Sequence, residues 1–375
     1  MKSQTVQIVS PGRVNLLGEH VDKNDGKVLP AAIDRSVKIS AESRQDHLLM
    51  LTASDLRQSV EIDLDHLDKK QDRAGNPLPT WALYPAGVAW SLKSAGYEVP
   101  GADCSFSSDI PMGAGLSSSA AVEVGFAVLW QALAGWEMDR VTLSRYCQKA
   151  EVEYAGVNCG LMDQFASANG VKDHAMLFDT RSLEFKAVPL PVDTALVIAD
   201  STIRHSLVTS AYNDRVNDCQ AAVAIAKKAN PSVKSLRDVS VAEFEALKSQ
   251  MSENVYKHAR HVVGEIERVD QAIQFLEAGD SQKFGKIMFA THASLRDFYE
   301  VSCPELDCLV DIAASYDSCI GARLTGAGFG GCTVNLVKQS EAEKFVADLA
   351  AEYHRKTSLR ASVFITHASQ GAHIA

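Results

Sequence analysis

The feature that most constrains this chain is a run of glycines and serines that leads directly into an apolar segment. Residues 111–121 read Pro-Met-Gly-Ala-Gly-Leu-Ser-Ser-Ser-Ala-Ala. Gly113 and Gly115 have no Cβ, so they tolerate positive φ and let an anion approach the backbone closely. Residues 120–133 favour a helix, so the N–H groups of residues 117–119 would lie at its N-terminus, where free donors and the helix dipole attract phosphate. The run therefore predicts a phosphate-binding loop.

The glycine run is also compatible with a simpler structure, a tight turn followed by a serine N-cap. It is not a Walker loop, because no Gly-Lys-Ser/Thr follows the glycines. A second run, at residues 324–332, places Gly326, Gly328 and Gly331 at the spacing of the dinucleotide fingerprint. That fingerprint requires a following helix, whereas residues 332–337 are strand-like. We therefore expect the second run to be a glycine turn that supports the phosphate loop.

Length, charge and cysteine pattern limit the class of protein. A chain of 375 residues is expected to hold two domains. The net charge of −10, with no basic cluster to offset it, argues against a nucleic-acid partner. The eight cysteines form no Cys-x-x-Cys pair, which favours free thiols in a reducing cytosol over a zinc site. No run of 18 apolar residues and no signal-peptide core is present, so we expect a cytoplasmic protein without a membrane span.

Hydrophobic patterning predicts a mixture of strands and helices. We expect strands over residues 6–9, 37–41 and 194–200, a hairpin over 174–190, and a strand–loop–strand unit over 321–336. We expect helices over residues 80–95, 120–134, 142–155, 208–229, 254–278 and 281–294. Pro189 and Pro191 interrupt the pattern, so the boundary between the two domains is placed near residues 188–193.

Four segments together resemble the ordered motif set of the GHMP small-molecule kinases. They are the run at 111–121, Pro-Gly-Arg-Val-Asn-Leu-Leu-Gly-Glu-His-Val-Asp at 11–22, Gly-Val-Asn-Cys-Gly-Leu-Met-Asp-Gln-Phe at 156–165, and Leu-Thr-Gly-Ala-Gly-Phe-Gly-Gly-Cys at 324–332. The segment at 11–22, followed by Val-Leu-Pro-Ala-Ala at 28–32, is similar to the galactokinases in particular. The resemblance covers the chain from about residue 11 to its final strands.

This resemblance implies a two-domain α/β (α+β) fold, the GHMP kinase architecture, with the active site in the interdomain cleft. The N-terminal domain, residues 1–190, would carry the sugar motif and the phosphate-binding loop, and the C-terminal domain, residues 191–375, the glycine-rich third motif. The implied activity is ATP-dependent phosphorylation of D-galactose at its anomeric hydroxyl, with Mg²⁺ as cofactor, giving galactose 1-phosphate and ADP. We expect a monomer whose partners are galactose and ATP, with no nucleic acid and no membrane.

The first motif departs from the galactokinase pattern, which leaves the identity of the sugar open. Galactokinases usually carry Thr and Tyr on either side of the aspartate, whereas this chain has Val21 and Lys23, followed by Asp25 and Lys27. Two lysines at the pocket mouth could accept an anionic or modified sugar, such as a uronic acid or galactosamine. Glu19 opposes a uronic acid, because it would repel a carboxylate at C6. A further alternative is a galactose and ATP sensor without turnover, which the uninterrupted serine run opposes.

Phosphoryl transfer needs neutralised phosphate charge, an oriented acceptor and a destination for the acceptor's proton. The resemblance assigns Asp163 as the catalytic base or orienting group. It places Arg13 beside Asp163, where a guanidinium keeps the carboxylate ionised and can bind the γ-phosphate. Asp163 also suits the N-cap of a helix that starts near residue 164, and both roles can hold. The resemblance assigns Mg²⁺ to Ser119 and Glu151; without it, Glu151 would be taken as an exposed helix charge.

The resemblance also assigns the binding residues. Glu19 and His20 would face the 6-hydroxyl of the sugar and Asp22 its ring hydroxyls, although a polar loop of this kind can also be merely solvated. The expected sugar-binding residues are Arg13, Glu19, His20, Asp22, Gly160, Asp163 and Tyr212. The expected ATP-binding residues are Trp81 and Tyr84 beside the adenine, and Gly113, Ala114, Gly115, Leu116, Ser117, Ser118 and Ser119 around the phosphates. Core packing is the alternative role for each of the three aromatic residues.

Overall fold

The largest sheet of the molecule has six strands and carries the N-terminal motif. The structure is a computed structural model that describes residues 5–204 and 208–375, and for residues 208–212 it describes the backbone alone. The strand order is β13 (His373–Ile374), β1 (Thr5–Asn15), β3 (Pro30–Ser43), β6 (Ala102–Ser108), β4 (Leu48–Ala53) and β5 (Gln58–Asp63). All neighbours are antiparallel except β4 and β6. A register shift between Pro11 and Arg13 bulges β1, and such bulges re-aim the side chains beside them.

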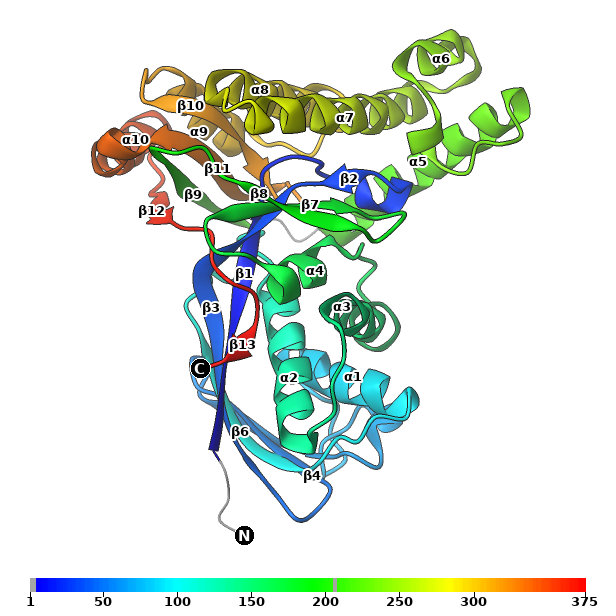
Figure 1. Cartoon of the computed structure of the whole chain (residues 1–375), viewed down its shortest axis with the longest axis vertical. Coiled ribbons are helices and arrows are strands. Elements are labelled where there is room, and N and C mark those ends of the chain that lie inside the picture. The colour runs from blue at the N-terminus through cyan, green and yellow to red at the C-terminus, as the bar shows by residue number, and fades with distance from the viewer. Residues whose placement is uncertain (1–4, 205–207) are drawn as a thin grey trace.

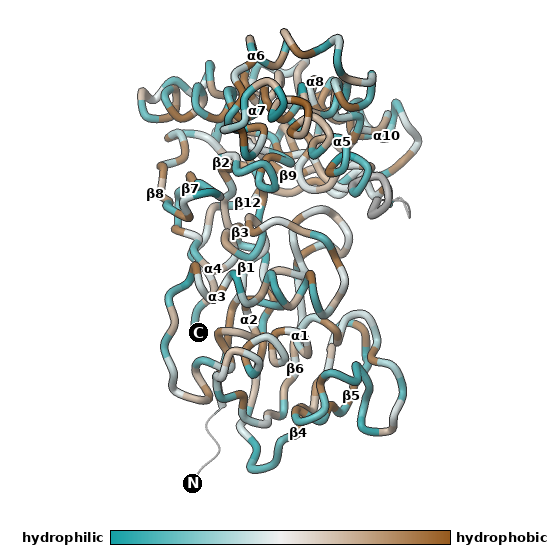
Figure 2. The backbone as a smooth tube through the Cα atoms, turned by 90° about the vertical axis from the view of Figure 1, so that its right-hand side faces the viewer, coloured by the Kyte–Doolittle hydropathy of each residue, from teal (hydrophilic) through white to brown (hydrophobic). Residues whose placement is uncertain are grey.

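Helices cover one face of this sheet. They are α1 (Thr80–Ser94), α2 (Ser118–Ala134), α3 (Arg140–Lys149) and α4 (Met162–Asn169). Helices α2 and α4 pack on β1 and β3, and α1 and α3 pack against α2 (Figure 1). The loops around β4 and β5 are largely hydrophilic (Figure 2). This arrangement places the N-terminus of α2 beside the bulge in β1.

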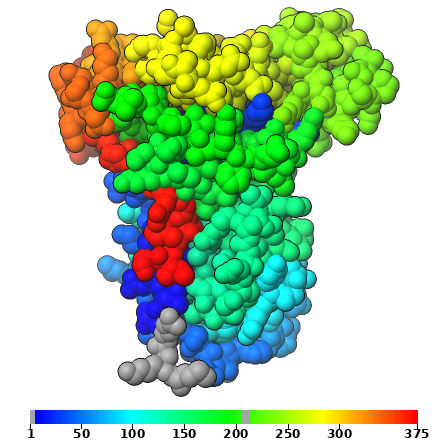
Figure 3. Space-filling view, viewed as in Figure 1, coloured from blue at the N-terminus to red at the C-terminus, as the bar shows by residue number. Residues whose placement is uncertain are grey.

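The second half of the chain is built on a four-stranded antiparallel sheet. Its strand order is β10 (Cys319–Thr325), β11 (Gly330–Lys338), β9 (Thr194–Arg204) and β12 (Ser362–Thr366). Helices α8 (Ser281–Asp297), α9 (Pro304–Ala314) and α10 (Ala342–Thr357) pack against it. Helices α5 (Val208–Ala229), α6 (Val241–Ala246) and α7 (Glu253–Glu277) extend to one side, so the molecule is broad at this end (Figures 1 and 3).

A three-stranded sheet lies where the two halves meet. It contains β2 (Lys27–Val28), β7 (His174–Asp179) and β8 (Phe185–Pro189). Short 3₁₀ helices span Asp22–Asn24, Leu67–Lys69, Leu236–Asp238, Lys248–Gln250 and Gln339–Glu341, and a π turn spans Ala150–Ala155. The end of the chain returns to the first sheet, where β13 pairs with β1 (Figure 3). The domain boundary near residue 190 stays a prediction.

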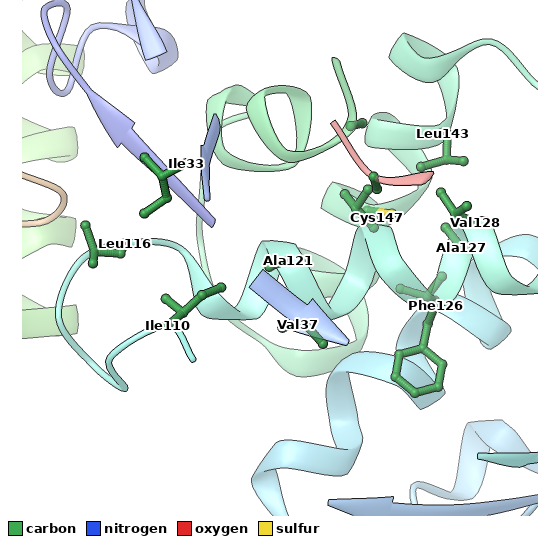
Figure 4. Packing of buried hydrophobic residues seen from close by; sticks show 14 of the residues in the cluster. Ile33, Val37, Ile110, Leu116, Ala121, Phe126, Ala127, Val128, Leu143 and Cys147 are labelled. Carbon is green, nitrogen blue, oxygen red and sulfur yellow. The ribbon is translucent and has the colours of Figure 1, made fainter. Parts of the chain in front are cut away.

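Apolar packing anchors the predicted phosphate loop. Figure 4 shows Ile110 and Leu116 of the loop in one cluster with Ile33 of β3 and with Phe126 of α2. All four side chains are at most 2% exposed. Burying side chains of this size stabilises the fold by about 1.5–3 kcal/mol each. None of the helices in the described part of the chain combines the length and the apolar character that crossing a membrane requires.

Candidate active site

The two glycine runs pack backbone against backbone. Gly113 and Gly115 have φ of 64° and 78°, a conformation that side chains disfavour. A Cβ on Gly326 would lie 2.7 Å from the carbonyl oxygen of Gly115, and a Cβ on Gly331 would lie 2.8 Å from that of Ala114. The second run therefore supports the first, as its sequence predicts. It is no dinucleotide fingerprint, because strand β11 and not a helix follows it.

A buried arginine joins this loop to the predicted catalytic aspartate. Arg13 is 3% exposed and donates from Nε and Nη2 to Oδ1 of Asp163, at 2.9 and 2.8 Å. Its Nη1 donates to the carbonyl of Gly115 at 2.5 Å, and its backbone N–H donates to the carbonyl of Leu116 at 3.1 Å. The hydroxyl of Ser117 donates to Oδ2 of Asp163 at 2.6 Å. Asp163 lies in the first turn of α4, where the helix dipole favours negative charge.

Glu19 is part of a buried ion pair that the sequence does not reveal. Its carboxylate accepts a hydrogen bond from Nη2 of Arg323, and a second one from the N–H of Gly326 at 3.1 Å. The side chains of Glu19 and Arg323 are 3% and 0% exposed. Glu19 follows β1 and Arg323 lies on β10, so the pair ties the two halves of the chain together beneath the predicted sugar site.

His20 is held in an unusual backbone conformation by aromatic packing. Its φ is 62°, and its ring stacks on Tyr299 with centroids 4.8 Å apart. Burial, reinforced by the charge of Arg323, lowers the pKa of His20 to about 3, so its imidazole is neutral near pH 7. Behind it, Nε2 of His261 donates to the carbonyl of Glu19 at 3.1 Å. These contacts fix the loop that carries both residues.

Asp22 lies directly against Gly160. A Cβ on Gly160 would fall 1.7 Å from Oδ2 of Asp22, so no other residue fits there without moving the carboxylate. The backbone N–H of Lys23 donates to Oδ1 of Asp22 at 3.0 Å. Burial, together with the negative charge of Asp163, raises the pKa of Asp22 to about 6. Asp22 is therefore mostly ionised at neutral pH and able to accept hydrogen bonds.

Glu151 is a buried carboxylate without a cationic partner among the described residues. It lies in the π turn after α3 and accepts hydrogen bonds from Sγ of Cys159 at 3.2 Å and from Nε2 of Gln164 at 2.5 Å. Burial and the nearby charge of Asp163 raise its pKa, while a hydrogen bond from Ser119 opposes the rise. A cation would relieve this cost, and Mg²⁺ prefers one or two carboxylates together with phosphate oxygens. Ser119 and Glu151 therefore suit Mg²⁺.

Most of the predicted sugar and catalytic residues line one pocket of about 200 Å³. Its lining includes Arg13, Glu19, His20, Asp22, Glu151, Gly160 and Asp163. No cluster of three or more metal-ligating side chains occurs within residues 5–204 and 208–375. A magnesium ion here would thus share its coordination shell with phosphate and water. The serines at 117 and 119 adjoin the pocket through their bonds to Asp163 and Glu151.

The aromatic residues that the sequence analysis assigns to ligand binding are not among the described residues that line this pocket. Trp81 donates from Nε1 to Gln58 at 2.7 Å and does not line the pocket. Tyr84, on the same helix, is close enough to Glu151 that this charge adds to burial in raising its pKa to about 12. Tyr212 belongs to α5, but its side chain falls outside the described residues, so its sugar contact stays a prediction.

The two unusual lysines of the first motif do not line the sugar pocket. Lys27 forms an ion pair with Asp270 at 2.7 Å. Lys23 donates to the side-chain oxygen of Asn158 and faces a neighbouring hollow. Asn158 itself lines the sugar pocket, so a place for Lys23 at the pocket mouth stays a prediction, whereas Lys27 is held by Asp270. The short 3₁₀ turn at Asp22–Asn24 directs Lys23 away from the side on which Asp22 meets the pocket.

Two further polar residues, Arg204 and Glu123, contact residues of the site without any motif to mark them. Arg204, at the end of β9, pairs with Asp200 at 2.7 Å and donates to the carbonyl of Met112, so a cation borders the phosphate loop. Glu123 of α2 is fully buried and accepts from Nε2 of Gln164 at 2.9 Å. Burial and the charge of Glu151 raise the pKa of Glu123 well above its usual range. Its place inside an apolar helix is the one sequence signal that could have singled it out.

Comparison with known families adds independent information. Residues 84–171 match the model of the GHMP kinases N terminal domain, and residues 272–355 match the GHMP kinases C terminal model. Residues 2–42 match the galactokinase galactose-binding signature. The first segment contains the predicted phosphate loop and Asp163, the predicted catalytic aspartate; the second contains the second glycine run, and the third the predicted sugar loop.

Similar proteins align over almost the whole chain. The galactokinase of Roseiflexus sp. is 44% identical over 366 residues, covering 98% of this chain and 92% of that protein. The galactokinase of Fusobacterium nucleatum is 40% identical, covering 97% and 93%. The crystal structure of Lactococcus lactis galactokinase complexed with galactose superposes with a TM-score of 0.93 at 34% identity, covering 99% and 95%. The mevalonate kinase of Methanococcus jannaschii shares the fold, with a TM-score of 0.67 at 19% identity and coverage of 98% and 99%.

Proposed function

This chain belongs to the galactokinase family of the GHMP kinases, and we propose on that premise that it transfers the γ-phosphoryl group of ATP to the anomeric hydroxyl of D-galactose. The products are galactose 1-phosphate and ADP. The observation that carries the proposal is the Arg13–Asp163 pair, which joins a phosphate-type loop to a polar pocket of about 200 Å³. A phosphoryl donor on the loop and a sugar in the pocket would meet at this pair.

Asp163 receives or orients the proton of the acceptor hydroxyl. Its carboxylate faces the pocket and is 30% exposed on its side chain, so an acceptor can reach it. Ser117 donates to one of its oxygens at 2.6 Å, so the carboxylate is able to accept a hydrogen bond from a hydroxyl. Arg13 balances the charge of Asp163 and lies beside the loop, where it can also neutralise a γ-phosphate.

The phosphate loop and the metal residues would bind the nucleotide. The N–H groups at the start of α2 would bind phosphate oxygens, which are favoured at a helix N-terminus. Ser119 and Glu151 would hold Mg²⁺, which supplies neutralisation of phosphate charge when bound. Trp81 and Tyr84 would lie toward the adenine, a role that their position at the start of α1 permits.

The sugar is recognised by groups that are fixed before it binds. Glu19 and neutral His20 would contact the 6-hydroxyl, Asp22 and the N–H of Gly160 the ring hydroxyls, and Tyr212 the sugar from α5. The burial of Glu19 and the packing of Asp22 on Gly160 support this role, because preset polar groups lose little entropy on binding. Lys23 and Lys27 lie outside the pocket, which favours galactose over a uronic acid.

The chain would act as a two-domain monomer in the cytosol on galactose and ATP alone. Residues from both predicted domains meet in the pocket, with Arg13 and Asp163 from the first and Gly326 from the second. This supports an active site in the cleft between the two predicted domains. The eight cysteines are all free, as expected in a reducing compartment.

The test is to locate the phosphate on the product. The protein is incubated with ATP, Mg²⁺ and D-galactose, ADP is quantified, and the product is examined by ³¹P and ¹H NMR. We expect galactose-dependent ADP release and a phosphate on C1. Binding of galactose without ADP release would instead indicate a sensor, and a phosphate on another carbon would overturn the assignment of the acceptor.

A further inference from the structure

A second hollow adjoins the sugar pocket on the other side of residues 158–160. One part of it has a volume of about 560 Å³ and the adjoining part about 330 Å³. Both parts are lined by Lys23, Arg145, Gln148 and Cys159, so they form one continuous groove, which we call the α3 groove. The larger part falls within the range of about 300–1,000 Å³ that is typical of small-molecule sites.

One face of α3 forms the main wall of this groove. Thr142, Arg145, Tyr146 and Lys149 recur at helical spacing along this face, and all four line the larger part. Arg145 and Lys149 are therefore like charges at positions i and i+4, an arrangement that destabilises a helix slightly. An anion bound between them would remove that repulsion.

Three cations of the α3 groove lack an acidic partner at ion-pair distance. None of Lys23, Arg145 and Lys149 forms an ion pair with an acidic side chain in the described part of the chain. Lys23 donates to the amide oxygen of Asn158, and the ammonium of Lys149 lies 5.1 Å from the centre of the Trp90 ring. Glu153 is the acidic residue in the larger part of the groove. The larger part thus carries three cations and one carboxylate, although the net charge of the chain is −10.

Arg181, at the far end of the groove, is different. It forms ion pairs with Asp25 at 3.0 Å and with Asp238 at 2.7 Å, so its charge is already satisfied. The free positive charge is thus confined to the region between Lys23 and α3.

We propose that the α3 groove binds a phosphorylated small molecule, with its phosphate monoester held by Lys23, Arg145 and Lys149. Charge-assisted hydrogen bonds from these side chains match the three terminal oxygens of a phosphate monoester. Thr142, Tyr146 and Gln148 add hydroxyl and amide groups along the same wall. They suit a ligand whose body carries hydroxyls, and the volume exceeds what a phosphate ion alone would fill.

The groove and the sugar pocket share a wall, so occupancy of one should affect the other. Asn158 and Cys159 line both, and Asp22 borders the smaller part of the groove. A bound anion would attract the ammonium of Lys23 away from Asn158 and would add negative charge beside Asp22. The ionised form of Asp22 then becomes less favourable, so galactose binds more weakly. This coupling rests on the proposed function, and by linkage galactose weakens the anion to the same degree.

The test measures binding directly, so it does not depend on catalytic activity. Glucose 6-phosphate is titrated into the wild-type protein by calorimetry with Mg²⁺ and ADP at saturation, which covers the phosphate loop. The same titration is made with the Arg145→Gln/Lys149→Gln variant. A matched control, Lys344→Gln/Arg355→Gln, removes the same charges from exposed positions on α10. Circular dichroism confirms that both variants are folded.

We expect the groove variant to raise the dissociation constant at least tenfold and the control to leave it within twofold. A titration with inorganic phosphate in place of glucose 6-phosphate shows whether the anion alone is sufficient for binding. Weaker binding of inorganic phosphate than of glucose 6-phosphate would identify a phosphorylated molecule as the ligand. Glucose without phosphate should not bind the groove. Equal affinity in the wild type and the groove variant would overturn the site.

The coupling is tested separately by measuring the dissociation constant of galactose with and without saturating glucose 6-phosphate. We expect glucose 6-phosphate to raise the dissociation constant of galactose at least threefold in the wild type and to leave it unchanged in the groove variant. A galactose affinity that does not respond in the wild type would overturn the coupling. Absence of galactose binding under all conditions would instead contradict the proposed function, while the glucose 6-phosphate titration would still report on the site.

Discussion

Removal of Arg323 should destabilise the protein severely. Its guanidinium is completely buried and donates to Glu19, to the carbonyl of Leu324 at 2.6 Å and to the carbonyl of Asn15 at 3.1 Å. Arg323→Met keeps much of the side-chain volume but leaves the carboxylate of Glu19 buried with the N–H of Gly326 as its remaining described donor. Removing one partner of a buried pair typically costs about 3–5 kcal/mol.

A double-mutant cycle separates the cost of the unpaired Glu19 carboxylate from the cost of lost packing around Arg323. Glu19→Gln together with Arg323→Met removes both charges, so the free energy of unfolding should recover by about 1–3 kcal/mol relative to Arg323→Met alone. Unfolding is followed by urea titration with tryptophan fluorescence, at constant pH and ionic strength. An Arg323→Met variant within about 1 kcal/mol of the wild type, or a double variant that is no better than the single one, would refute this reasoning.

Four further predictions follow from the site. Asp163→Asn should keep galactose binding, measured by calorimetry, but lower kcat about 10²–10⁴-fold; near wild-type turnover would make Asp163 structural. Ser119→Ala and Glu151→Gln should each raise the Mg²⁺ concentration needed for half-maximal activity and leave galactose affinity little changed. If that Mg²⁺ concentration is unchanged in both variants, neither residue belongs to the metal site. Because the pKa of Asp22 is raised to about 6, galactose affinity should fall as the pH drops below 6, and Asp22→Asn should flatten that profile. The pKa of His20 is about 3 in the folded protein and near 6.5 in the unfolded chain, so the unfolded chain binds a proton more readily. The free energy of unfolding should therefore fall by up to about 1.4 kcal/mol per pH unit as the pH drops from 6.5 toward 3. His20→Gln should reduce this slope.

The sequence predicts those parts of the site that depend on local backbone chemistry. Gly113 and Gly115 adopt the positive φ that their lack of a Cβ permits, and α2 begins at Ser118, within the serine run and two residues before the predicted start. The second glycine run is followed by a strand, as its β-branched residues indicate. Arg13 and Asp163, 150 residues apart, meet as the motif resemblance implies.

Long-range pairing and side-chain direction could not be predicted from the sequence. Arg323 lies in an ordinary strand, and nothing near it in the sequence points to Glu19, 304 residues away. The predicted helix over 142–155 ends as a π turn, which buries Glu151 instead of exposing it as helical periodicity would suggest. Lys23 is adjacent to Asp22 in sequence, yet the turn directs its side chain into a different hollow. In each case the outcome depends on tertiary packing.

The most direct test of the account is the ranking of sugars by kcat/KM in the wild-type protein. D-galactose, 6-deoxy-D-galactose and D-galacturonate are compared at saturating ATP and Mg²⁺. Buried Glu19 should favour the free 6-hydroxyl, so 6-deoxygalactose should lose at least about 1–3 kcal/mol of transition-state stabilisation, or roughly 5- to 150-fold. Galacturonate should be poorer still, because its carboxylate would enter a pocket already lined by Glu19, Asp22 and Asp163. Galactose ranked first would support the account, and galacturonate ranked first would contradict it.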